Sequence, residues 1–243
     1  MFTRQVKVTC LAMLFIGVLR GQELMLVYSN NFNGMLKSCG CAGNELGGMA
    51  FASLYLDELR GQYRDLMVVD AGDFFPWKQM PVETEFAIRF LEQMKYDALG
   101  VGDNELSLGV DFLCAQAVER HLPLVSGSLR RDGHFVVSPY VIKPFPWGLV
   151  GVTGYLDPNI FSLVDSTKVP GCDCASLEEV VSVLDSLDRM VDITVLLAHA
   201  PIEKCRVLAH TFRAADVIVA AHDQKVQTIP LTSDGVRIVE AGG

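Results

Sequence analysis

Residues 24–34, LMLVYSNNFNG, decide the fold class of this chain. The apolar run at 24–29 has the length of a buried strand, and the glycine that ends the stretch marks a turn. Open α/β proteins place their chemistry at the carboxyl ends of such strands. This strand end carries three amides, Asn30, Asn31 and Asn33, and it therefore raises the question of what site is built from asparagine.

Apolar strand-like runs alternate with helical patterns along the rest of the chain. The segments expected as helices are 45–60, 82–95, 110–121 and 176–190, and those expected as strands are 65–70, 96–101, 123–128, 192–199, 216–221 and 236–240. This alternation predicts βαβ units with right-handed crossovers and a largely parallel inner sheet in one α/β domain. Residues 134–156 contain two β-rich runs around Pro-Trp-Gly, which predicts a hairpin and therefore mixed sheets.

The N-terminus has the pattern of a secretory signal peptide. Two positive charges in MFTRQVK precede the apolar run VTCLAMLFIGVL, so residues 1–21 are predicted to be a signal peptide, cleaved near Gly21 or kept as an anchor. A first core strand with a basic start is the other interpretation. Export predicts a periplasmic or otherwise extracytoplasmic location, and no later stretch has the length of a stable membrane span.

The chain is acidic, with a net charge of −9 that becomes −12 without residues 1–20. Such a negative net charge is typical of a soluble acidic surface, and it argues against sequence-independent binding of nucleic acid.

The cysteines beyond the N-terminal run are even in number: Cys39, Cys41, Cys114, Cys172, Cys174 and Cys205. Cys114 and Cys205 lie in helical patterns and are expected to be small buried residues. The pairs at 39–41 and 172–174 are expected in loops, where a disulfide between the loops is the favoured interpretation and a thiolate metal site the alternative. Haem attachment is excluded because Cys-x-x-Cys-His is absent.

Four strand ends carry side chains that can bind a metal ion: Asp73, Asp103, His199 and His222. Two carboxylates and two imidazoles suit Mn²⁺, Fe²⁺ or Zn²⁺. Each residue alone has a simpler explanation, because an Asp can cap a helix and a single His is usually structural. The four together indicate a metal site.

The motifs YSNNFNG, VVDAGDFF, YDALGVGDNELSLG, VLLAHAP and DVIVAAHDQ, in this order, resemble the metallophosphatase domain of the 5′-nucleotidase branch of the calcineurin-like phosphoesterases. The resemblance covers about residues 24–243. It implies a four-layer α/β/β/α sandwich of two mixed sheets flanked by helices, with two metal ions at the strand ends. It also implies hydrolysis of phosphate esters by metal-activated water.

The first metal position departs from the family pattern. Asn31 and Asn33 stand where the family has an Asp and a His, and Gln224 stands where it has a second His. Neutral amides are weak ligands for first-row transition metals, so this position is expected to be lost.

The second metal position is expected to persist. Asp73, which the two positions share, is kept, as are His199 and His222, and Asp103 replaces a family Asn. The resemblance therefore implies one divalent metal ion, Mn²⁺, Fe²⁺ or Zn²⁺, instead of two.

The acid–base residues of the family are missing as well. Asn104 and Ser107 stand where the family has a catalytic His and its Asp partner, and neither transfers a proton near neutral pH as His does. Losing a general acid–base typically costs about 10²–10⁴-fold in rate.

Three functional hypotheses follow for residues 22–243. The first is an exported hydrolase of small phosphate esters that is weak or inactive, and the second is a non-catalytic binding or assembly module with an unknown protein partner. The third is a redox or metal-handling protein that uses the Cys-x-Cys pairs. The nucleotide-specificity domain that follows this domain in true 5′-nucleotidases is not expected, because the sequence ends at VEAGG.

Overall fold

The computed structural model describes residues 11–18, 22–38, 48–227 and 229–242. The first half contains β1 (Leu11–Val18), β2 (Gln22–Ser29), α1 (Met49–Gln62), β3 (Leu66–Asp70), α2 (Pro81–Met94), β4 (Ala98–Gly100), α3 (Asp103–Ser107), α4 (Val110–Glu119) and β5 (Leu124–Val125). The second half contains β6 (Leu129–Arg131), β7 (His134–Phe135), β8 (Tyr140–Phe145), β9 (Gly148–Leu156), α5 (Pro158–Phe161), β10 (Cys172–Cys174), α6 (Leu177–Asp188), β11 (Ile193–His199), α7 (Ile202–Leu208), β12 (Val217–Ala221), β13 (Leu231–Ser233) and β14 (Val236–Val239).

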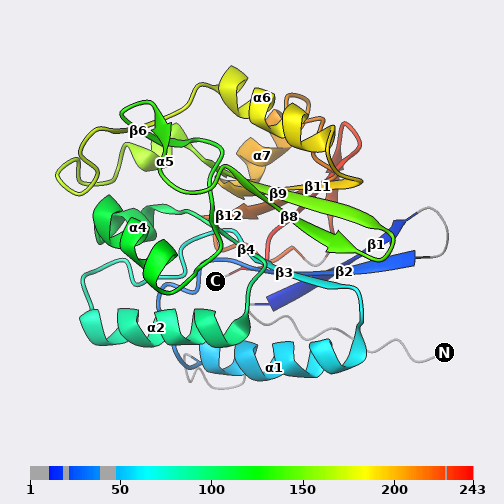
Figure 1. Ribbon diagram of the computed structural model, residues 1–243, viewed down its shortest axis with the longest axis horizontal. Coiled ribbons are helices and arrows are strands. Elements are labelled where there is room, and N and C mark those ends of the chain that lie inside the picture. Colours follow the sequence, from blue (N-terminus) through cyan, green and yellow to red (C-terminus); the bar gives the residue numbers. More distant parts are fainter. Residues whose placement is uncertain (1–10, 19–21, 39–47, 228, 243) are drawn as a thin grey trace.

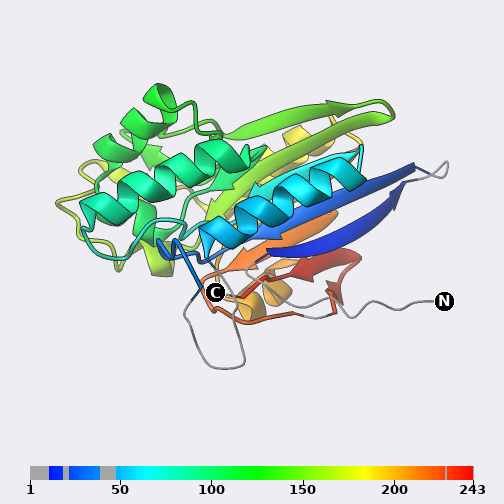
Figure 2. The same ribbon diagram turned by 90° about the horizontal axis from the view of Figure 1, so that it is seen from below.

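Two sheets packed face to face form the centre of the molecule (Figures 1 and 2). One has the order β1-β2-β3-β4-β5 and the other the order β13-β14-β12-β11-β9-β8. Both sheets are mixed: the inner strands are parallel, and an antiparallel strand lies at one edge of the first sheet (β1) and at both edges of the second (β13 and β8). Helices α1, α2 and α4 cover the outer face of the first sheet, and α6 and α7 cover that of the second. The predicted four-layer sandwich is confirmed.

The alternation of side chains along β2 shows why these layers form. Leu24, Leu26 and Tyr28 pack against the second sheet, while Met25 and Val27 pack under the helices. All five are buried because both faces of an inner parallel strand are covered, which explains the unbroken apolar run in the sequence.

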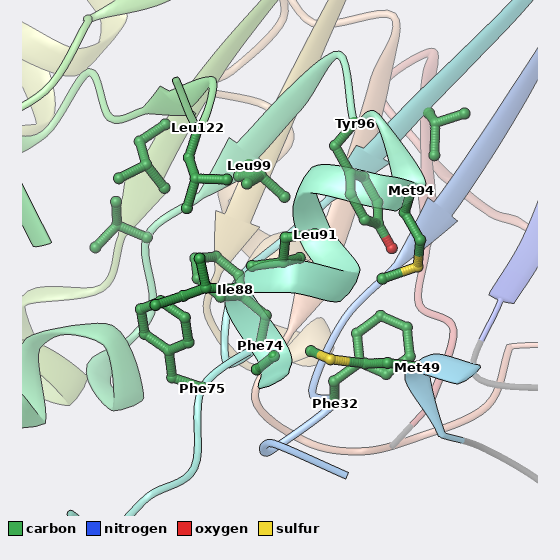
Figure 3. Close-up of a cluster of buried hydrophobic side chains, with 14 of the residues drawn as sticks. Phe32, Met49, Phe74, Phe75, Ile88, Leu91, Met94, Tyr96, Leu99 and Leu122 are labelled. Carbon is green, nitrogen blue, oxygen red and sulfur yellow. The ribbon is translucent and has the colours of Figure 1, made fainter. Parts of the chain in front are cut away.

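Three buried aromatic residues fix the loops that carry the polar strand ends. Phe32 lies between Asn31 and Asn33, and Phe74 and Phe75 follow Asp73 directly. Figure 3 shows these rings in the core under the helices, and the rings of Phe74 and Phe75 meet edge to face with centroids 4.7 Å apart. Burial of each ring stabilises the fold by roughly 1.5–3 kcal/mol, so the neighbouring polar residues stand on anchored turns.

Two local predictions are confirmed. β8 and β9 form the expected hairpin, with Phe145 opposite Gly148 across the turn. The helix expected over 176–190 is present as α6, and it begins with a capping box in which Ser176 and Glu179 each accept from the backbone N–H of the other.

The small sheet β10-β6-β7 was not expected from the sequence. Its strands are two or three residues long, which is too short to show a period. The expectation that residues 172–174 form a loop is wrong, because they pair as β10 with β6.

The N-terminal apolar run forms the edge strand β1, which pairs antiparallel with β2 from Leu11 opposite Ser29 to Val18 opposite Gln22. The structure thus matches the alternative interpretation of this run as a first strand. Cleavage of residues 1–21 stays a prediction. Among the described helices, none is long and apolar enough to span a membrane.

Candidate metal centre

Four strand ends converge on one cluster of ligand atoms. Asp73 lies in the loop after β3, Asp103 begins α3 just after β4, His199 ends β11, and His222 follows β12. One ligand atom from each of the four lies within 4.8 Å of the others. The residues that the sequence placed at four separate strand ends therefore form one site, which the two sheets build jointly.

The spacing of the ligand atoms fits a single divalent ion. Nε2 of His199 lies 3.1 Å from Oδ1 of Asp103 and 3.5 Å from Oδ1 of Asp73, and Nδ1 of His222 lies 3.6 Å from Oδ1 of Asp103. Ligands about 2.0–2.2 Å from a tetrahedral ion lie about 3.4 Å from one another. The side chains are therefore already arranged as ligands would be.

The cluster has a buried floor and an open side. The side chains of His199 and Asp73 are 1% and 10% exposed, whereas those of Asp103 and His222 are 27% and 33% exposed. Solvent, or a substrate, therefore reaches the site from the side of Asp103 and His222.

The surroundings of His199 set its orientation and its charge. Its Nδ1 lies 3.1 Å from the carbonyl oxygen of Ala71, a contact that fixes the ring with Nε2 toward the carboxylates. Burial alone would lower the pKa of His199, but Asp73 and Asp103 outweigh burial and raise it to about 9. The site thus attracts positive charge strongly, and metal binding must displace a proton.

The two carboxylates differ in their environment. Burial raises the pKa of Asp73. Burial would also raise the pKa of Asp103, but the hydrogen bond and the charge of His199 outweigh it and lower that pKa.

Glu105 holds the backbone around the site in place, a role that was not predicted from the sequence. Its fully buried carboxylate accepts backbone N–H groups from Asp73 (2.9 Å), Gly102 (2.8 Å) and Phe75 (3.0 Å). Burial and the charge of Asp73 raise the pKa of Glu105 to about 8. Glu105 ties the Asp73 loop to the start of α3, and its position as the third residue of that helix, typical of a capping box, is the signal that identifies it.

The strand ends around the site have an unusual backbone conformation. Asn31, Asn33, Asp73, His222 and Gln224 all have positive φ, at 55°, 51°, 61°, 95° and 56°. Residues other than glycine adopt this conformation only when the surrounding structure holds them in it. The surrounding structure therefore holds these strand ends in tight turns, and the side chain of Gln224 is exposed.

Asn31, Asn33 and Asn104 form a hydrogen-bonded group, here named the amide cluster. Oδ1 of Asn31 accepts the backbone N–H of His222 at 3.1 Å, and Nδ2 of Asn104 donates to Oδ1 of Asn33 at 2.8 Å. Nδ2 of Asn33 donates to the carbonyl of Asn31 at 2.8 Å, and Nδ2 of Asn104 also donates to that of Phe75 at 3.2 Å. The site built from asparagine is thus a network that joins strand ends from both sheets.

Two further residues singled out in the sequence make structural contacts. The Ser107 hydroxyl donates to the carbonyl of Asn104 at 2.7 Å, within α3. Asn30 bonds the C-terminal segment, since its Oδ1 accepts the N–H of Ala241 at 2.8 Å and its Nδ2 donates to Gly242. The contact made by Ser107 is the usual one for a helical serine.

The described cysteines contain no disulfide. Cys172 and Cys174 are free and half-buried, and burial raises the pKa of both thiols. Cys39 and Cys41 lie outside the described residues, so the disulfide between the two pairs stays a prediction. Cys205 is buried as expected, and Cys114 is half-buried.

Comparisons with known proteins agree with this architecture. The 5′-nucleotidase of Homo sapiens is 24% identical over 221 residues, 82% of this chain and 38% of that protein, and the Bos taurus protein is 24% identical over 90% of this chain and 41% of its own length. The chain thus spans about two-fifths of the curated relatives that it matches. No protein-family model matches it.

Two solved structures show the same fold. The 5′-nucleotidase precursor of Thermus thermophilus superposes with a TM-score of 0.76 and 20% identity, over 90% of this chain and 49% of the other. The calcineurin-like phosphoesterase YfkN of Bacillus subtilis superposes with a TM-score of 0.74 and 20% identity, over 89% and 80%. This chain therefore has the fold of these phosphoesterases, and its sequence is similar to that of the 5′-nucleotidases.

Proposed function

We propose that this domain binds one divalent metal ion, Mn²⁺, Fe²⁺ or Zn²⁺, through Asp73, Asp103, His199 and His222, and hydrolyses small phosphate esters only weakly. The observation that carries the proposal is the convergence of these four side chains within 4.8 Å, at the spacing of metal ligands. When bound, the metal would supply Lewis-acid polarisation of a phosphoryl oxygen and activation of water.

The residues beside the four proposed ligands supply neither a general acid nor the ligands of a second metal ion. Asn33 and Asn104 use their side chains in the amide cluster, so they neither transfer a proton nor replace the missing ligands. With no general acid, hydrolysis is expected to fall by about 10²–10⁴-fold and to favour esters with good leaving groups. The first metal position is proposed to be lost, because neutral amide oxygens are poor ligands for these metals.

A non-catalytic binding or assembly module outside the cytoplasm is the second candidate function. The amide cluster favours it, because its hydrogen bonds between protein groups join strand ends from both sheets. The protein partner of such a module is unknown. The export that it requires rests on the signal-peptide pattern of residues 1–21.

Metal analysis of the full chain, purified without chelators, tests the proposal. The expected result is one ion per chain, lost in His199→Ala and kept in His210→Ala, a control at an exposed histidine. Two ions per chain would refute the loss of the first position, and no ion would refute the metal site.

Hydrolysis of 4-nitrophenyl phosphate then separates the two candidate functions. A slow metal-dependent rate that vanishes in His199→Ala supports the weak hydrolase. The absence of any rate in protein that holds its metal supports the non-catalytic module. Asn104→His should raise a slow rate by about 10²-fold or more if the missing acid limits it.

A further inference from the structure

Asp70, the last residue of β3, is a fully buried carboxylate that no step of the proposed chemistry uses. Its Oδ1 accepts the backbone N–H of Gly72 at 2.8 Å, and its Oδ2 accepts the hydroxyl proton of Ser29 at 2.5 Å. Burial raises the pKa of Asp70 to about 7, although both hydrogen bonds act in the opposite direction. Because burying a charged group is costly, the position of this carboxylate needs a physical reason.

A chain of hydrogen bonds holds the carboxylate in place. Ser29 ends β2 and lies opposite Asp70 in the register of the first sheet. The Oγ atom of Ser29 also lies 2.8 Å from the hydroxyl of Tyr96, whose ring is buried in the core (Figure 3). Tyr96 therefore donates to Ser29, since Ser29 uses its own proton on Asp70. The carboxylate is thus tied both to β2 and to the segment between α2 and β4.

The turn that Asp70 holds makes two contributions to the metal centre. Ala71 presents its carbonyl oxygen to Nδ1 of His199 at 3.1 Å, and Asp73 supplies a proposed ligand atom. Gly72 between them has a φ of 102°, and a Cβ atom at this residue would lie 2.9 Å from Nδ1 of His199. The turn and the imidazole are therefore in close contact, so a shift of the turn moves the acceptor for His199 and the backbone of Asp73 together.

The charge of Asp70 is directed at the metal centre. In the described part of the chain, no lysine or arginine forms an ion pair with Asp70, and the charged groups that act on its pKa are Asp73 and His199. Asp97, which precedes β4, is a useful contrast, because it also accepts a backbone N–H of β3 but is paired with Lys143 at 2.7 Å. A buried charge without an opposite charge is strongly disfavoured. The positive charge that offsets Asp70 therefore comes from the metal centre, as the imidazolium of His199 or as a bound cation.

We propose that Asp70 is a positioning residue of the metal centre. Through the turn at 71–73 it fixes the carbonyl that orients His199 and the backbone of Asp73, and its negative charge adds to the attraction for a divalent ion. This inference rests on the proposed metal binding. Residues that orient metal ligands in this way typically contribute about 10-fold to 100-fold to metal affinity. Ser29 acts through Asp70, so its contribution should be smaller.

The affinity of the full chain for Zn²⁺, measured at pH 8 by competition with a coloured chelator, tests the proposal. Asp70→Asn removes the charge, and its single amide oxygen serves only one of the two donors that the carboxylate accepts. It should weaken Zn²⁺ binding at least about tenfold, and Ser29→Ala should weaken it less. Asp97→Asn is the matched control, and it should leave the affinity unchanged because Asp97 lies at the end of β4 opposite to Asp103. Circular dichroism confirms that each variant is folded.

A readout without metal separates this proposal from the metal site itself. The Nδ1–H proton of His199, identified by NMR through its loss in His199→Ala, should shift or broaden in Asp70→Asn and stay unchanged in Asp97→Asn. An original protein that binds no Zn²⁺ would refute the proposed metal site, and this resonance would then decide the positioning role alone. Equal Zn²⁺ affinity of the Asp70→Asn variant and the original protein, or an unchanged His199 resonance in that variant, would overturn the inference.

Discussion

Glu240 offers a sharp test of the electrostatics beside the metal centre. The residue follows β14 and is fully buried. Its Oε1 accepts the backbone N–H of Lys225 at 3.0 Å, whereas its Oε2 has no hydrogen-bond partner among the described residues. Burial raises the pKa of Glu240 to about 7, and the charge of Asp223 adds to this effect.

The sign of the stability effect follows from this shift. A carboxyl whose pKa is higher in the folded state binds its proton more tightly there, so folding stability falls as the pH rises from about 4.5 to about 7. At about 1.4 kcal/mol per pKa unit, the full penalty is about 3 kcal/mol, and most of it develops between pH 5 and pH 8. Glu240→Gln removes the ionisation and keeps the shape.

The assay is thermal unfolding of both proteins at pH 5 and pH 8, with chelator present so that metal binding does not contribute. The advantage of Glu240→Gln over the original protein should be about 2–3 kcal/mol larger at pH 8 than at pH 5, or about 5–10 °C in melting temperature. Other buried carboxyls change the stability of both proteins equally between pH 5 and pH 8, so their contributions cancel when the two proteins are compared. A difference between the two proteins that does not change with pH would refute the burial of an ionising Glu240.

Three further outcomes are expected. Glu105→Gln places an amide N–H₂ against backbone donors and should cost about 2–4 kcal/mol of stability in a denaturant titration; an unchanged midpoint would contradict its supporting role. Gly154→Ala puts a methyl group 2.5 Å from the carbonyl oxygen of Val125, where the two sheets meet, and should cost at least about 1–3 kcal/mol in the same assay. Zn²⁺ at 100 times its dissociation constant should stabilise the protein by about 2.7 kcal/mol, which calorimetry would detect as an upshift that is reversed by chelator and absent in His199→Ala.

The sequence by itself determined the layers of the fold and identified the four side chains that are proposed as metal ligands. Unbroken apolar runs such as 24–29 indicate strands covered on both faces, and parallel strands bring their carboxyl ends to one edge. Asp73, Asp103, His199 and His222 follow four such strands, so local pattern alone was enough to name them.

Only the tertiary structure decided how these ends meet and what surrounds them. The short strands of the β10-β6-β7 sheet and the support by Glu105 depend on partners distant in the chain, which no local period encodes. The resemblance in sequence implied that Asn31, Asn33 and Asn104 stand at positions of metal ligands and of a catalytic acid. That they hydrogen-bond into one cluster follows from the tertiary structure. The strand order of the first sheet brings Asn33 and Asn104, 71 positions apart, to 2.8 Å, and the packing of the two sheets brings the backbone N–H of His222 to 3.1 Å from Asn31.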